Sequence, residues 1–133
     1  MNKNLFNRLL KDARRRSLKK SRIVHITYIL DGNRIVAIGI NSKTTHPASP
    51  HNYKQLHSEL DAVLNIRISD ECKKYHFKNI RAIAKRYSVF NVRVMKNGSI
   101  SIAKPCKSCI KMLRDLQFKK IYFTNKGGML EQL

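Results

Sequence analysis

Hydrophobic and polar positions along the chain change their spacing several times, and each change predicts a new element. Apolar residues in the first stretch recur at helical spacing, with Leu5, Leu9 and Ala13 on one face. Two runs rich in β-branched residues follow, at 23–30 and 34–40. The DGN sequence between them is a turn signal, so the pair predicts a β-hairpin.

The rest of the chain alternates between helical and extended patterns. Strands separated by helices predict an α/β layered sandwich, and no linker or repeat divides the chain, so residues 1–133 are expected to form one domain. After the hairpin, the expected elements are a long loop at 41–55, a helix at 56–67, a loop with a short helix at 68–86, a strand at 88–95, an extended stretch at 99–104, a helix at 106–117, a strand at 120–124 and an antiparallel return at 129–133.

The charge of the chain is its strongest compositional signal. Lysine and arginine number 28 against 8 acids, a formal charge of +20. Such a surface attracts polyanions, so we expect contact with single-stranded DNA or RNA; codon bias toward lysine explains only part of the excess. Aromatic residues Tyr53, Tyr122 and Phe123 are candidates for stacking on bases or for core packing. The expected basic contacts form a cluster: Arg14, Arg15, Arg16, Lys19, Lys20 and Arg22.

Cysteine content and hydropathy narrow the class of protein. Three cysteines, an odd and low number, argue against a disulfide framework and favour a reducing intracellular compartment, with bound metal or free thiols. No stretch approaches the roughly 18 apolar residues of a membrane span. The N-terminus lacks the apolar core of a secretory signal, although its arginines leave a transit peptide open beside the amphipathic helix.

Two short motifs carry candidate chemistry. Cys106 and Cys109 stand one helical turn apart after Pro105, where a helix N-terminus favours the thiolate form that binds metal. A redox pair or two small core residues are the alternatives. His57 begins the preceding predicted helix, and Glu59 lies two positions later, poorly placed to share a metal with it. A His/Cys/Cys set leaves a fourth zinc position open, as in catalytic sites.

Together, the HSE sequence at 57–59 and the PCKSC sequence at 105–109 resemble the zinc-dependent cytidine and deoxycytidylate deaminase superfamily. The resemblance covers roughly residues 23–124. It implies a three-layer α/β/α sandwich with a five-stranded mixed sheet. It also implies one catalytic Zn²⁺ bound by His57, Cys106 and Cys109, with Glu59 shuttling protons while cytosine is hydrolysed to uracil and ammonia.

The same resemblance suggests residues that bind the substrate. Asn41 would contact the nucleoside, unless it is only a turn residue at a strand end, and Ser58 would offer its backbone N–H to the base, with Pro105 nearby. The loop at 42–54 is similar to one in small phage-encoded deaminases, which suggests a viral source. A second, structural zinc site is a weaker possibility than a free thiol and surface histidines; its candidate ligands are Cys72, His76, His46 and His51.

The substrate remains open at this level. The charge favours cytosine in single-stranded DNA or RNA. The likeness to small phage enzymes favours a free cytosine nucleotide or nucleoside, such as deoxycytidylate or cytidine. A third possibility is a non-catalytic nucleic-acid-binding module with structural zinc, which Glu59 argues against because a structural site normally recruits a fourth protein ligand.

Overall fold

The computed structural model describes residues 1–43, 56–66 and 76–133, and this part of the chain contains four helices and six strands. The helices are α1 (Lys3–Ser17), α2 (Ser58–Leu64), α3 (His76–Ala84) and α4 (Lys107–Asp115). The strands are β1 (Val24–Asp31), β2 (Arg34–Ile40), β3 (Ser88–Val94), β4 (Ile100–Ser101), β5 (Lys120–Thr124) and β6 (Leu130–Gln132).

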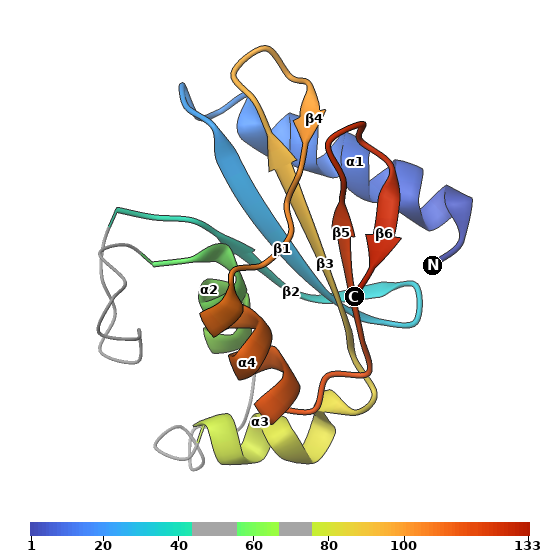
Figure 1. Cartoon of the computed structure of the whole chain (residues 1–133), viewed down its shortest axis with the longest axis vertical. Coiled ribbons are helices and arrows are strands. Elements are labelled where there is room, and N and C mark those ends of the chain that lie inside the picture. The colour runs from blue at the N-terminus through green and yellow to red at the C-terminus, as the bar shows by residue number, and fades with distance from the viewer. Residues whose placement is uncertain (44–55, 67–75) are drawn as a thin grey trace.

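The strands form a mixed sheet, as the sequence predicts. Its order is β2-β1-β3-β5-β6, and the short β4 pairs with β3 beside this path (Figure 1). The pair β3–β5 is parallel, whereas β1–β2, β1–β3, β3–β4 and β5–β6 are antiparallel. The predicted hairpin is confirmed as β1 and β2, and β6 confirms the predicted antiparallel return.

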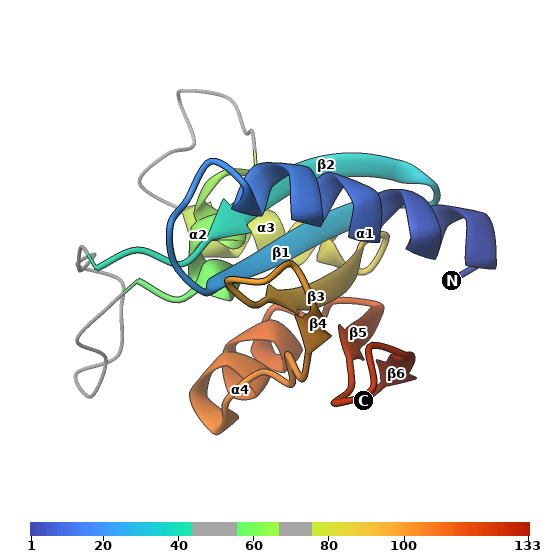
Figure 2. The same cartoon turned by 90° about the horizontal axis from the view of Figure 1, so that it is seen from above.

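The helices cover both faces of this sheet. The apolar face of α1 packs on one side, where Leu9 and Ala13 are fully buried. Residues of α2, α3 and α4, among them Val63, Ile80 and Leu113, pack against the other side. Figure 2 shows α4 across the strands from α1. The protein is therefore a mixed α/β structure with helices on both sides of a central sheet.

Helix α1 has the local signals that its sequence suggests. Asn2 is its N-cap, and the side-chain oxygen of Asn2 accepts a hydrogen bond from the backbone N–H of Leu5 at 2.8 Å. Three arginines lie in the last turn, where positive charge complements the helix dipole. None of the helices in the described ranges is long and apolar enough to cross a membrane.

Some boundaries differ from the prediction. Helix α2 ends at Leu64, three residues before the predicted end, and α3 occupies the segment whose pattern was ambiguous. The extended stretch before Pro105 contains the two-residue strand β4, which adds a sixth strand to the five expected. Weak periodicity in these short segments explains the differences, because a two-residue strand has no repeating pattern to detect.

Helix α2 sits directly against β2, and this contact places the candidate site. A Cβ atom added to Gly39 would lie 2.2 Å from both Ser58 O and Ala62 N, so only glycine allows the two backbones to approach this closely. Side chains of α2 also bind β2. Asp61 Oδ2 accepts a hydrogen bond from Ile40 N at 2.9 Å, and Asn65 Nδ2 donates to Ile38 O at 2.8 Å.

Candidate metal centre

The first residues of α2 and α4 meet at the candidate metal centre. His57 is the N-cap of α2 and Cys106 the N-cap of α4, and neither side chain caps its own helix. Cys109 lies one turn into α4, on the same side as Cys106. Their side chains therefore converge from segments about fifty residues apart, as the sequence predicts.

The geometry of this ligand group, His57, Cys106 and Cys109, suits a tetrahedral metal ion. His57 Nδ1 lies 3.8 Å from Cys106 Sγ and 3.6 Å from Cys109 Sγ. All three ligand atoms lie within 4.8 Å of one another. Zinc bonds of about 2.1 Å to nitrogen and 2.3 Å to sulfur at a tetrahedral angle give an N···S separation of about 3.6 Å. The three residues could thus hold zinc.

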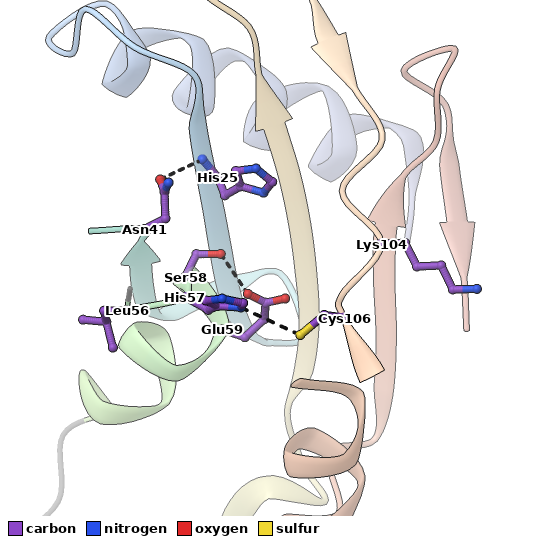
Figure 3. A pocket seen from close by; sticks show the side chains of 8 residues that line it. All are labelled: His25, Asn41, Leu56, His57, Ser58, Glu59, Lys104 and Cys106. Carbon is purple, nitrogen blue, oxygen red and sulfur yellow. Dashed lines mark hydrogen bonds between the residues drawn. The ribbon is translucent and has the colours of Figure 1, made fainter. Parts of the chain in front are cut away.

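A pocket of about 210 Å³ opens beside the ligand group. It is smaller than the roughly 300–1,000 Å³ of typical ligand pockets. In Figure 3 the side chains of His57, Glu59 and Cys106 point toward one another, whereas the Lys104 side chain points away from them. The residues that line this pocket are His25, Asn41, Leu56, His57, Ser58, Glu59, Lys104 and Cys106.

Glu59 is buried in this pocket but lies outside the ligand group. Both of its carboxyl oxygens accept hydrogen bonds. Ser58 Oγ donates to Oε1 at 3.1 Å, and Asn91 Nδ2 donates to Oε2 at 2.9 Å. The Thr27 hydroxyl lies 2.8 Å from Ser58 Oγ and 2.7 Å from Asn91 Oδ1. We call Thr27, Ser58 and Asn91 the carboxyl clamp.

Asn41, a predicted substrate ligand, is held by its neighbours at the pocket wall. Its Oδ1 accepts hydrogen bonds from Arg22 Nη1 at 3.1 Å and from His25 N at 3.0 Å, and its backbone oxygen accepts from Arg22 Nη2 at 2.8 Å. Because these contacts occupy the side-chain oxygen, the group that Asn41 can offer to a substrate is its side-chain amide nitrogen, which is a hydrogen-bond donor. Its contact with a substrate stays a prediction.

His25 also lines this pocket, and sequence reasoning did not single it out. Burial, with the nearby positive charges of Arg93 and Arg22, lowers the pKa of His25 to about 4. His25 is therefore neutral at physiological pH, so its ring offers one donor and one acceptor nitrogen.

Most of the arginines in the basic cluster have partners within the protein. Arg15 and Arg16 pair with Asp12, and Arg14 Nε donates to Gly98 O at 3.2 Å. Lys19 and Lys20 are exposed on the segment between α1 and β1. Arg22, through Asn41, links the end of the cluster to the pocket.

Most of the other residues proposed from the sequence are either buried or outside the described residues. Tyr122 and Phe123 are only 7% and 6% exposed, so the structure favours core packing over stacking on bases for both. Pro105 is also buried. Tyr53, Cys72, His46 and His51 lie outside the described residues. The second zinc site therefore stays a prediction, with His76 the first residue of α3.

Sequence reasoning missed Thr27 and Asn91. The available signal was a polar residue in the middle of each apolar strand run, in HITYIL and in VFNVRV.

Comparison with models of protein families, with curated proteins and with solved structures found no match to this chain. The chemistry of the site therefore rests on its own residues.

Proposed function

We propose that this protein is a zinc-dependent hydrolase that converts cytosine to uracil, with release of ammonia, in single-stranded DNA or RNA. One observation carries the proposal. Two members of the ligand group, His57 and Cys106, line one pocket together with the buried carboxyl of Glu59, which lies outside that group. This combination suits hydrolytic chemistry, because a catalytic zinc site has three protein ligands and an open position.

The ligand group, Glu59 and Asn41 have separate roles in this proposal. His57, Cys106 and Cys109 hold the metal, and zinc in such a site acts as a Lewis acid that makes water a strong nucleophile near neutral pH. Glu59 takes a proton from the attacking water and gives it to the ring nitrogen of cytosine. It then takes the second proton, from the hydroxyl group now on C4, and gives it to the amine, so that the C4–N bond breaks and ammonia leaves. Asn41 donates a hydrogen bond to the substrate through its side-chain amide.

Pocket size and charge support a base presented on a polymer. A cavity of about 210 Å³ suits one base more than a whole nucleotide. Enzymes that act on a base in a strand bring that base into a small pocket and bind the backbone outside it. A charge of +20 exceeds what a single phosphate requires and suits a backbone with many phosphates.

The decisive experiment compares substrates. Purified zinc-loaded protein is incubated with cytidine, dCMP, dCTP, single-stranded DNA and RNA, and uracil is measured. We expect turnover of the oligonucleotides. Glu59→Gln should keep the zinc and reduce turnover by about 10²–10⁴-fold, as expected for loss of an acid–base group. Turnover of mononucleotides alone would show a nucleotide-metabolising enzyme, and no turnover of any substrate would overturn the proposal.

Salt dependence tests the polymer separately. Binding to single strands should weaken as salt rises, with a log–log slope of ~0.7 per neutralised phosphate. Because the arginines of the basic cluster have internal partners, Lys19→Gln with Lys20→Gln is the cleaner change. We expect a flatter slope for oligonucleotides and unchanged turnover of any mononucleotide. A slope equal to that of the unmodified protein would exclude these lysines from the contact.

A further inference from the structure

The carboxyl group of Glu59 is fixed from two sides. Ser58, its neighbour on α2, donates to one oxygen, and Asn91 on β3 donates to the other. In the part of the chain that the structure describes, no lysine or arginine forms an ion pair with Glu59. Its orientation therefore depends on neutral hydrogen-bonding groups rather than on a cation.

Thr27 closes this arrangement into a ring. It lies directly opposite Asn91 across the β1–β3 pair and contacts both Asn91 and Ser58. Thr27 is fully buried and Asn91 is 4% exposed. The ring therefore joins two central strands to the first turn of α2, and rotation of Glu59 would break at least one of its contacts.

These buried polar groups avoid the cost of burial because they are paired with one another. A buried hydroxyl or amide left unpaired costs about 1–3 kcal/mol, and a valine or leucine in a central strand carries no such cost. The neighbouring inward positions, Ile29 on β1 and Val89 on β3, are apolar. The fold thus accepts apolar residues on this face, and polar ones occur where the strands pass Glu59.

We propose that Thr27 and Asn91 are positioning residues that hold the Glu59 carboxyl in one orientation beside the ligand group, an inference that rests on the proposed function. They act through Glu59 and Ser58 and do not touch the substrate. Ser58 Oγ donates to one carboxyl oxygen and Asn91 Nδ2 to the other, so the two contacts together fix the plane of the carboxyl group.

The test uses matched variants on the same two strands. Asn91→Leu removes the donor, Thr27→Val removes only the hydroxyl, and Thr27→Ser restores it. Ile26→Val, next to Thr27 but facing α1, controls for mild destabilisation. In zinc-loaded protein we expect kcat to fall by about 10²-fold in Asn91→Leu and less in Thr27→Val, since small misplacement of a catalytic group costs rates of this order. KM, zinc content and the other two variants should change little.

A second readout does not require activity. The chain has three glutamates, Glu59, Glu71 and Glu131, so ¹³C-labelled glutamate gives three carboxyl signals in NMR, and loss of one in Glu59→Gln identifies Glu59. We expect Asn91→Leu and Thr27→Val to shift that signal, and Thr27→Ser and Ile26→Val to leave it in place.

The two readouts separate the two proposals. An unchanged Glu59 signal and kcat in both Asn91→Leu and Thr27→Val would overturn the positioning role, even in an active deaminase. A shifted signal in a protein without turnover of any substrate would overturn the proposed function and leave the clamp as described. A fall in zinc content parallel to kcat would show a structural role in place of the positioning one.

Discussion

The two faces of β1 and β3 differ although the same strands form both. Toward α1, the side chains of these strands that enter the core cluster are apolar apart from the Tyr28 hydroxyl; they are Val24, Ile26, Tyr28, Leu30, Phe90, Val92 and Val94. Toward α2 and α4, the same strands present His25 and Thr27 on β1 and Asn91 and Arg93 on β3. Only farther along does this face become apolar, at Ile29 and Val89.

This difference separates stability from chemistry within one sheet. The α1 face buries mainly apolar area, which stabilises the fold, and the polar Tyr28 hydroxyl on it donates to Asp12. The opposite face gives up part of that burial at the end of the strands where α2 and α4 begin. Since buried polar groups need partners, they occur together, and they surround the candidate site. Changes on the two faces should therefore have separable effects.

The largest effect is expected from the ligand group. Cys109→Ser should remove zinc and all measurable turnover, because two remaining ligands hold the ion far more weakly. Metal analysis of the purified protein should fall from about one zinc per chain to near zero. Cys72→Ser is the matched control and should keep its zinc. Full activity of metal-free protein would contradict the proposed chemistry, and zinc loss in the control would indicate the second site.

The opposite face should respond in stability alone. Leu9 is fully buried on the side of α1 that faces the sheet, and Leu9→Ala should lower the free energy of unfolding by about 2–5 kcal/mol through lost burial and a cavity. Zinc content and turnover per folded molecule should not change. Urea unfolding measures the first quantity, and metal analysis at low temperature measures the second. Loss of zinc from folded protein would show that the two faces are coupled.

A substitution at Gly39 tests the close contact between β2 and α2. A methyl group there would lie 2.2 Å from backbone atoms of α2, so Gly39→Ala must displace the helix that carries His57 and Glu59. We expect a loss of about 1–3 kcal/mol in unfolding free energy, typical of overpacking, and lower turnover. Gly127→Ala, whose nearest neighbour would be 3.5 Å away, should change neither. Equal behaviour of both variants would contradict this tight contact.

The smallest effect concerns a carboxylate on the α1 side. Partial burial opposes ionisation of Asp12, but hydrogen bonds from Tyr28, Arg16 and Arg15 outweigh it and lower its pKa to about 2. Tyr28 Oη donates to Asp12 Oδ2 at 2.6 Å. Because the unfolded chain binds the proton first as pH falls, this contribution is present above about pH 4 and is lost toward pH 2.

Asp12→Asn should therefore lower stability at pH 7 by about 1–2 kcal/mol, and the difference from the unmodified protein should shrink between pH 4 and pH 2. Urea unfolding at several pH values measures it. Asp115→Asn, at an exposed position, is the control and should show no such change. A difference that persists at pH 2 would contradict the lowered pKa.

The sequence predicts the helices and strands better than it predicts which distant residues contact one another. The hairpin and the helix bearing Cys106 and Cys109 follow from apolar spacing, a local property. The meeting of His57 with those cysteines followed from resemblance of two motifs, since spacing alone does not bring distant segments together. Thr27 and Asn91 were missed because each contact spans a long separation, 64 positions between the two. A polar residue in a central strand signals that a partner exists but not which one.

The basic residues show the same limit of prediction from sequence. The basic residues can be counted in the sequence, but the contacts that they make within the protein cannot be seen there. Arg14 binds a backbone oxygen 84 positions away, and Arg22 binds Asn41. Local clustering therefore predicts where basic residues gather but not their contacts: Arg14 and Arg15 are exposed like Lys19 and Lys20, yet both arginines have partners within the protein.

The backbone bridge between Ser42 and Leu56 bears on how this chain can vary through evolution. Two hydrogen bonds of 3.0 Å join these residues, next to Asn41 and His57. Residues inserted or deleted between them change the length of a segment whose ends stay tied. Doubling the length of a flexible segment costs only about 0.6 kcal/mol in closure entropy. Descendants of this protein can therefore differ in the length of that segment while inheriting the ligand group unchanged.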